Sequence, residues 1–265
     1  MKLPLYQVDA FASRLFEGNP AAVCPLEAWL SDELLQSIAT ENNLSETVFF
    51  VPNQVGFDIR WFTPNGEVGL CGHATLACAF VIFNHIQTGA DQIVFNSLSG
   101  QLIVRKDGNK LVMDFPALPF EAMRMDPKYL RLINIAPKAI FKSTFDLLFI
   151  LENETEVENA ELDLTAISKL PYRGVIISAT TNKFGGDIYS RCFYPKHNVP
   201  EDPVTGSAHC VLAPYWCKEL GKIKIQATQG SKRKGKLVCE MAGDRVLLSG
   251  ECQLYLQGAL FLPNR

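Results

Sequence analysis

The chain repeats itself, and this duplication is the feature that most limits how it can fold. Each half contains an Arg-x-Phe-x-Pro motif, RWFTP at 60–64 and RCFYP at 191–195. Each motif is followed by a glycine turn, Gly72 in the first half and Gly206 in the second. The motifs lie 131 residues apart and the glycines 134, in the same order, which indicates two structurally equivalent halves.

Two further elements recur ahead of these landmarks. Residues 31–40 and 163–170 each begin with a capping side chain and then space apolar residues as a helix does, while 47–51 and 174–178 are rich in strand formers. A repeat of this length excludes a solenoid, whose period is ~20–50 residues. We predict an α+β fold of two pseudo-symmetric domains, each a set of strands with a buried helix.

The boundary between the halves is expected where two prolines follow a strand-like run at 113–122. This divides the chain into an N-terminal half, 1–117, and a C-terminal half, 118–265. The segment 244–262 alternates enough to form strands, and its last strand could return to the first domain.

Composition narrows the function classes. The net charge of −3 and the lack of a long basic run give no reason to expect nucleic acid. The uncharged region 69–90 has an apolar core of only 76–83, which indicates a buried helix rather than a membrane span. Asp9 interrupts the N-terminus before any long apolar run, so no secretory signal is expected and we predict a cytoplasmic protein. The eight cysteines are then expected to be free thiols, mostly buried.

The glycine turns are candidate anion sites. Gly72 and Gly206 each precede an uncharged stretch long enough for a helix, and the free N–H groups and dipole at a helix start favour negative charge. Two such starts, one per domain, could grip a small carboxylate substrate. The alternative is that both glycines only allow tight packing, and the sequence leaves both interpretations open.

Polar residues that the repeat does not duplicate are the candidates for chemistry. When the two halves are aligned on their glycine turns, His73 corresponds to Ser207. When they are aligned on their Arg motifs, Glu46 corresponds to Ile177. Glu46 borders an apolar strand, where a buried carboxylate could serve as a general acid/base; it could equally lie on the exposed face or cap a turn. His73 could move a proton, or only anchor its turn. Asp202 opens an Asp-Pro turn, which alone is a weak signal.

At these residues the sequence resembles the phenazine-biosynthesis (PhzF-like) isomerase family, which shares its architecture with diaminopimelate epimerase and proline racemase. The resemblance covers essentially the whole chain. The stretches that carry it are VDAFASRLFEGNPAAVC at 8–24, NLSETVFF at 43–50, LCGHATLA at 70–77, DPVTGSA at 202–208 and TQG at 228–230.

The resemblance implies a diaminopimelate epimerase-like fold, in which each domain is a curved, mostly antiparallel, barrel-like sheet around a central helix. It also implies a cofactor-independent isomerase, usually a homodimer, with its site in the cleft between the domains. The catalytic roles fall on Glu46, which would move a proton between substrate carbons, and on His73 and Asp202. Substrate contacts fall on four residues, with Asn19 as a possible addition: Ser45, Gly72, Gly206 and Ser207.

Three alternatives stay open. Racemases of this fold place two thiols across the substrate; Cys71 occupies one such position, but Thr205 occupies the other, so a Cys71-dependent epimerase is the weaker hypothesis. A protein that binds a small molecule without catalysis is another. Cys71 and His73 could share a metal with His209 and Cys210, but the paired spacing of zinc sites is missing, so we predict no metal and no cofactor. No nucleotide-binding glycine motif occurs.

Overall fold

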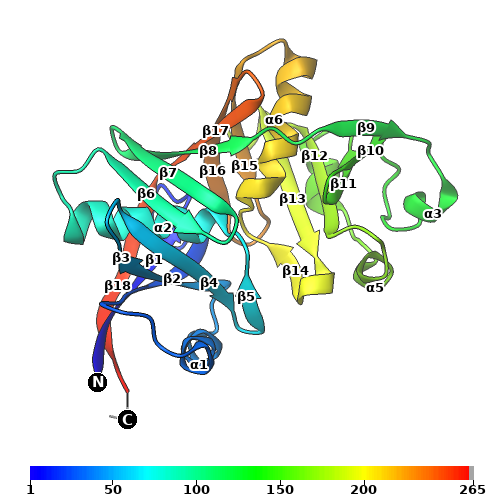
Figure 1. The fold of residues 1–265 in the computed structure, drawn as a ribbon. Helices are drawn as coiled ribbons and strands as arrows, with labels where there is room; N and C mark the ends of the chain where they lie inside the picture. Colours follow the sequence, from blue (N-terminus) through cyan, green and yellow to red (C-terminus); the bar gives the residue numbers. More distant parts are fainter. Residues whose placement is uncertain (263–265) are drawn as a thin grey trace. The chain divides into compact units, whose positions relative to one another are not determined.

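The structure, a computed structural model, describes residues 1–262 (Figure 1). Contacts divide the chain into two compact units. Unit 1 comprises Met1–Asp114 together with the chain from Ser249 onward, and unit 2 comprises Phe115–Leu248. The first boundary lies after residue 114, whereas the sequence predicted it after residue 117. The chain leaves unit 2 and returns to unit 1 at residue 249.

Unit 1 is built from strands with two α-helices and one π-helical turn. Its elements are β1 (Lys2–Ala10), β2 (Asn19–Pro25), α1 (Asp32–Asn42), β3 (Glu46–Pro52), β4 (Phe57–Thr63), β5 (Gly66–Val68), α2 (Gly72–Val81), η1 (Ile82–Ile86), β6 (Gln92–Ser97), β7 (Gly100–Asp107), β8 (Lys110–Pro116) and β18 (Cys252–Phe261).

Unit 2 contains the equivalent strands and a longer central helix. Its elements are β9 (Phe120–Met123), α3 (Pro127–Leu130), β10 (Ala139–Ser143), β11 (Asp146–Ile150), α4 (Glu154–Asn159), α5 (Leu164–Ser168), β12 (Gly174–Thr180), β13 (Ile188–Tyr194), the 3₁₀ turn η2 (Pro195–His197), β14 (Val199–Asp202), α6 (Gly206–Leu220), β15 (Lys224–Gln229), β16 (Gly235–Ala242) and β17 (Arg245–Gly250).

The strand pairing repeats from one unit to the other. In unit 1, β1–β2, β3–β4 and β6–β7 are antiparallel, while β2–β3 and β4–β6 are parallel. In unit 2, β10–β11, β12–β13 and β15–β16 are antiparallel, while β11–β12 and β13–β15 are parallel. The predicted α+β fold with a pseudo-symmetric duplication is therefore confirmed. β18 pairs with β1 and so belongs to unit 1.

The register of the two units corrects one predicted correspondence. Phe49 pairs with Arg60 across β3 and β4, and Ile177 pairs with Arg191 across β12 and β13. Counting back three residues, the counterpart of Glu46 is Gly174, and the predicted match to Ile177 is wrong. A Cβ atom at Gly174 would lie 2.2 Å from the carbonyl oxygen of Phe193, so this position of unit 2 has no room for a carboxylate.

The central helix of unit 1 is buried on almost every side. All but two of the ten residues of α2 are buried, which is typical of a core helix without a polar face. The Thr75 hydroxyl donates to the carbonyl of Cys71 at 2.6 Å and so fastens the first turn. No helix within residues 1–262 is both long and apolar enough to span a membrane.

One glycine sets the start of β2, the strand that carries Asn19 toward α2. Gly18 has φ +66°, a left-handed conformation that an L side chain rarely adopts. A Cβ atom there would lie 2.1 Å from the carbonyl oxygen of Ala10, the residue that pairs with Asn19 in β1. Gly18 is therefore required both by its φ and by the close approach of two backbone segments.

We expect Gly18→Ala to destabilise the protein more than Gly108→Ala. Gly108 has φ +58° with nothing within 4 Å of its ideal Cβ, so alanine there costs only the strain of a positive φ, ~1–2 kcal/mol. At Gly18 the clash with Ala10 adds ~1–3 kcal/mol. Equilibrium urea unfolding measures both losses, and equal losses would show that β1 yields to the extra carbon.

Candidate active site

Glu46 and His73 face each other inside unit 1. Glu46 is the first residue of β3, and His73 is the second residue of α2. Glu46 Oε2 lies 3.0 Å from His73 Nε2, and the side chains are 17% and 6% exposed. The contact is an ion pair by distance, although it falls short of a well-aligned hydrogen bond. Within residues 1–262 neither of these buried atoms has a hydrogen-bond partner.

Three more side chains complete the cluster around the His73 ring. Asn19, which is fully buried, places its Nδ2 3.3 Å from His73 Nδ1. The Ser45 hydroxyl donates to Asn19 Oδ1 at 3.0 Å. Cys71, the N-cap of α2, places its sulfur 3.5 Å from the same Nδ1. The ring therefore meets a carboxylate at one nitrogen, and an amide and a thiol at the other.

Burial and charge act in opposite directions on His73. Burial of the ring favours the neutral form and lowers its pKa. The Cys71 sulfur, when it is ionised, and the Glu46 carboxylate favour the charged form, and together they raise the pKa of His73 well above its usual range. Burial raises the pKa of the Cys71 thiol to about 11, aided by the Glu46 carboxylate and opposed by His73. Cys71 is consequently a neutral thiol near pH 7, which disfavours a thiolate base at this position.

The same three groups could in principle bind a metal ion. One ligand atom each from Glu46, Cys71 and His73 lies within 4.8 Å of the others. However, the carboxylate approaches Nε2 whereas the sulfur approaches Nδ1, so the two groups lie at different nitrogens of the ring. An ion held by one of these nitrogens would require the other ligand to move. The arrangement fits proton exchange through the ring better than a metal centre.

In unit 2, Asp202 lies just ahead of α6. Its carboxylate accepts a hydrogen bond from the hydroxyl of Thr205, the N-cap of α6. Gln229, in the TQG stretch at the end of β15, donates to the Asp202 carbonyl at 3.0 Å and accepts from the Thr205 backbone N–H at 2.9 Å. This network fixes the turn that begins α6 at Gly206.

Ser207 is held by a residue that sequence reasoning missed. Arg173 Nη1 donates to the Ser207 hydroxyl at 3.0 Å, and the same guanidinium forms a two-point ion pair with the buried Asp146. Arg173 lies directly before β12, in the position that Ser45 occupies before β3. A basic residue immediately ahead of an apolar strand was the available signal, once the halves were aligned in the correct register.

The predicted site residues thus form two sets. Unit 1 brings together Glu46, His73 and Ser45, with Gly72 as the first residue of α2. Unit 2 brings together its own predicted residues, Asp202, Gly206 and Ser207, and adds Thr205, Gln229 and Arg173. The catalytic and binding roles of both sets stay predictions.

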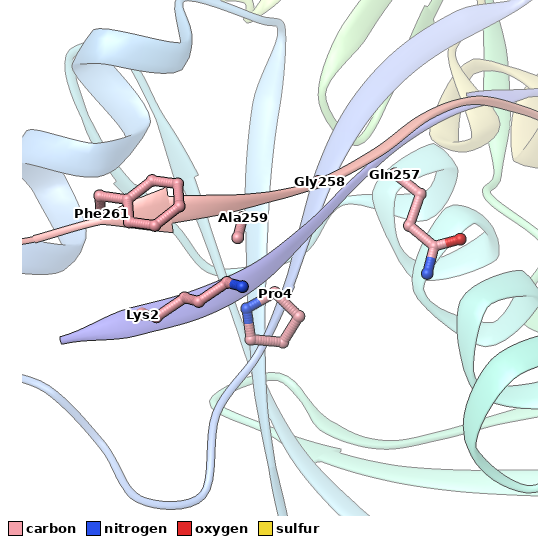
Figure 2. Close-up of a pocket in the computed structure, with 6 residues that line it drawn as sticks. All are labelled: Lys2, Pro4, Gln257, Gly258, Ala259 and Phe261. Carbon is pink, nitrogen blue, oxygen red and sulfur yellow. The ribbon is translucent and has the colours of Figure 1, made fainter.

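A surface hollow on unit 1 does not coincide with this cluster. It is lined by residues of β1 and β18, and Figure 2 shows Lys2 and Phe261 close together there, with the Lys2 ammonium 5.7 Å from the ring centre. Lys2 is eight residues from Ala10, which pairs with Asn19, or about 26 Å along the strand. The hollow brings no carboxylate or histidine together and so offers no comparable chemistry.

A second buried histidine provides a test of stability. His209 Nδ1 lies 2.9 Å from the Thr205 carbonyl, which makes it a donor, and burial lowers the pKa of this ring to about 4. The unfolded chain therefore binds a proton that the folded protein refuses between about pH 6.5 and pH 4. Stability is fully present above pH 6.5 and falls as the pH drops, by about 3 kcal/mol through this ring.

We expect His209→Gln to flatten the pH dependence of the unfolding free energy between pH 7 and pH 4. His197→Gln, at an exposed position, should leave it as in the wild type. Urea unfolding at several pH values measures the slopes. Equal slopes in the wild type and His209→Gln would show that the ring is protonated in the folded protein.

Thiol chemistry tests the protonation of Cys71. All eight cysteines are free and buried, and with a pKa of about 11 in place of 9.0, Cys71 should carry ~100-fold less thiolate at pH 7 than an unperturbed thiol. We expect iodoacetamide to alkylate the native protein slowly and to alkylate all eight thiols rapidly in urea. Mass spectrometry measures both rates. Fast labelling at pH 7 that Cys71→Ser abolishes would instead identify a reactive thiolate.

The chain is similar in sequence to a known protein family and to proteins of several organisms. Residues 8–258 match the family model of the phenazine biosynthesis-like proteins. An uncharacterized isomerase of Pseudomonas aeruginosa is 47% identical over 99% of this chain and its own whole length. A human phenazine biosynthesis-like domain-containing protein is 39% identical over 98% of this chain and 99% of its own.

Solved structures indicate the same family and fold. A PhzF family protein of Enterococcus faecalis superposes with a TM-score of 0.95 and 42% identity, over 99% of this chain and all of that one. A hydroxyproline epimerase of Agrobacterium vitis shares the fold, with a TM-score of 0.62 and 8% identity over 98% and 92% of the two chains. The predicted resemblance and the epimerase-like fold are confirmed, and the chain belongs to the phenazine biosynthesis-like (PhzF) family.

Proposed function

We propose that this protein is a cofactor-independent isomerase that moves a proton between two carbons of a small carboxylic acid, with Glu46 as the acid/base. One observation carries the proposal. Glu46 Oε2 and His73 Nε2 are two buried polar atoms, 3.0 Å apart, that have no hydrogen-bond partner among the described residues. The curated relatives named as isomerases support the reaction class.

The reaction balances with one carboxylate. Glu46 removes a proton from a substrate carbon, so a C–H bond breaks, an O–H bond forms, and the electron pair passes into the conjugated acid. The O–H bond of Glu46 then breaks and the proton is delivered to a second carbon. His73, whose Nε2 faces the carboxylate, hydrogen-bonds to Glu46 or to the substrate as the charge changes.

Each unit has a helix start that can bind an anion. The backbone N–H groups at Gly72 in unit 1 are proposed to bind the substrate carboxylate, because they attract negative charge without adding a formal charge beside the acid/base. Gly206 and Ser207 provide the equivalent groups at the start of α6 in unit 2. Asp202 is proposed to assist the transfer. The Ser45 hydroxyl is already committed to Asn19, so we assign it to support of the ring rather than direct substrate contact.

The energetics of the pair favour a functional role. Burying a carboxylate beside an imidazole costs desolvation that their attraction rarely exceeds, and apolar residues in their place are often as stable or more stable. A chain selected for stability alone gains little from Glu46 and His73 at this position. The homodimer implied by the resemblance and the cytoplasmic location predicted from the sequence remain part of this proposal.

We expect Glu46→Gln to abolish isomerisation while ligand binding survives. Glutamine keeps the size of the side chain but cannot accept and return a proton, and loss of an acid/base lowers rates ~10²–10⁴-fold. The protein is incubated with small cyclic dienoic, hydroxy and amino acids, and product isomers are followed by proton NMR while calorimetry measures binding. Glu41→Gln, at an exposed position of α1, is the matched control.

The outcomes separate the candidate functions. An isomer formed by the wild type and Glu41→Gln, but not by Glu46→Gln, supports the proposal. Equal turnover in Glu46→Gln would contradict it. Binding of an acid by the wild type without any conversion would instead identify a binding protein on this fold, and conversion that depends on Cys71 would identify an epimerase.

A further inference from the structure

The surroundings of His73 Nδ1 raise a question that the reaction scheme leaves open. The ring is buried. Among the contacts that the structure describes, two side chains approach its Nδ1, Asn19 at 3.3 Å and Cys71 at 3.5 Å. A buried ring nitrogen needs a donor when it carries a lone pair and an acceptor when it carries a proton. The identity of these neighbours therefore determines which protonation states the ring can adopt.

In the neutral ring, both neighbours of Nδ1 act as donors. The Ser45 hydroxyl donates to Asn19 Oδ1, which turns the NH₂ group of Asn19 toward the ring. Cys71 is a neutral thiol near pH 7 and offers an S–H. Nδ1 then carries the lone pair, so the single ring proton lies on Nε2, toward Glu46.

The charged ring requires the opposite arrangement. Its Nδ1–H needs an acceptor, and a neutral thiol is a poor one. Rotation of the Asn19 amide by half a turn presents Oδ1 to Nδ1–H and the NH₂ group to Ser45. A serine hydroxyl both donates and accepts, so the Ser45–Asn19 and Asn19–His73 hydrogen bonds both persist with their directions reversed.

We propose that Asn19, held by Ser45, is a positioning residue that selects the Nε2–H tautomer of neutral His73 and, by turning its amide, accepts Nδ1–H when the ring is charged. The proposal rests on the proposed function, because it explains how a buried ring can gain and lose a proton beside Glu46. It concerns the ring alone and can be tested without a substrate.

The charges that act on the ring come from three directions. Glu46 of β3 and Cys71 at the N-cap of α2 are the ionisable groups that act on it. The positive end of the α2 dipole opposes a second proton on the ring. Asn19 is uncharged, so it can donate to the neutral ring or accept from the charged ring without adding a charge of its own.

Nitrogen-15 NMR of the histidine side chains reads the tautomer directly, because a protonated ring nitrogen and a lone-pair nitrogen resonate far apart. The chain has four histidines, and the His73→Gln and His209→Gln spectra assign the two buried ones. At the high-pH end of the folded range we expect His73 to be protonated at Nε2. His209, which donates from Nδ1 to Thr205, should show the opposite tautomer in the same spectrum.

Variants at position 19 test the second state. Aspartate only accepts, so Asn19→Asp should raise the midpoint of the His73 titration by about one pH unit or more. Asn19→Leu removes the acceptor and should lower that midpoint. Ser45→Ala keeps the amide but releases its orientation, so neutral His73 should become a mixture of tautomers. His209 should not change in any of these variants.

Three results would overturn the proposal. They are a neutral His73 protonated at Nδ1 in the wild type, an Asn19→Asp titration that coincides with the wild type, and a ring that stays doubly protonated throughout the folded pH range. Each is independent of turnover, so loss of isomerase activity in these variants would bear on the proposed function and not on the tautomer.

Discussion

The ion pair between Glu46 and His73 is the interaction on which the architecture of unit 1 converges. Parallel pairing of β2 and β3 brings Ala21 beside Glu46, and α2 carries His73 to the same place at its first turn. The left-handed Gly18 starts β2 so that Asn19 reaches the ring. A pair buried this deeply weakens a fold unless it is well supported, and each of these elements supplies part of that support.

The duplication separates the shared scaffold from the residues that are proposed to act in catalysis. Two units with the same strand pairing can bear different side chains at equivalent positions, and the differences gather at the starts of β3 and α2 and of their counterparts β12 and α6. The divergent pairs are Ser45 and Arg173, Glu46 and Gly174, Cys71 and Thr205, and His73 and Ser207. Unit 1 therefore presents a carboxylate and an imidazole, whereas unit 2 presents a guanidinium and hydroxyls. The scaffold is repeated, and the side chains at these positions are not.

The sequence predicted the repeat, the helices that follow Gly72 and Gly206, and the strands at 47–51 and 174–178, because turn residues and apolar periodicity are local signals. The register was missed because the β3–β4 connection spans 53–56 whereas the β12–β13 connection spans 181–187, which shifts the alignment by three residues. The hydrogen-bond network around the His73 ring was also not predicted, because its hydrogen bonds join residues far apart in the chain and no local sequence pattern indicates such contacts.

Isotope transfer tests the central claim, that Glu46 carries a proton between substrate carbons, most directly. The protein is incubated in D₂O with the acid that it converts, and deuterium in the recovered ligand is measured by NMR in the wild type, Glu46→Gln and Glu41→Gln. We predict that the protonated Glu46 exchanges with solvent in part of the turnovers, so that deuterium enters the ligand in the wild type and Glu41→Gln, and not in Glu46→Gln. Equal incorporation in Glu46→Gln would contradict the account, because another group would then carry the proton.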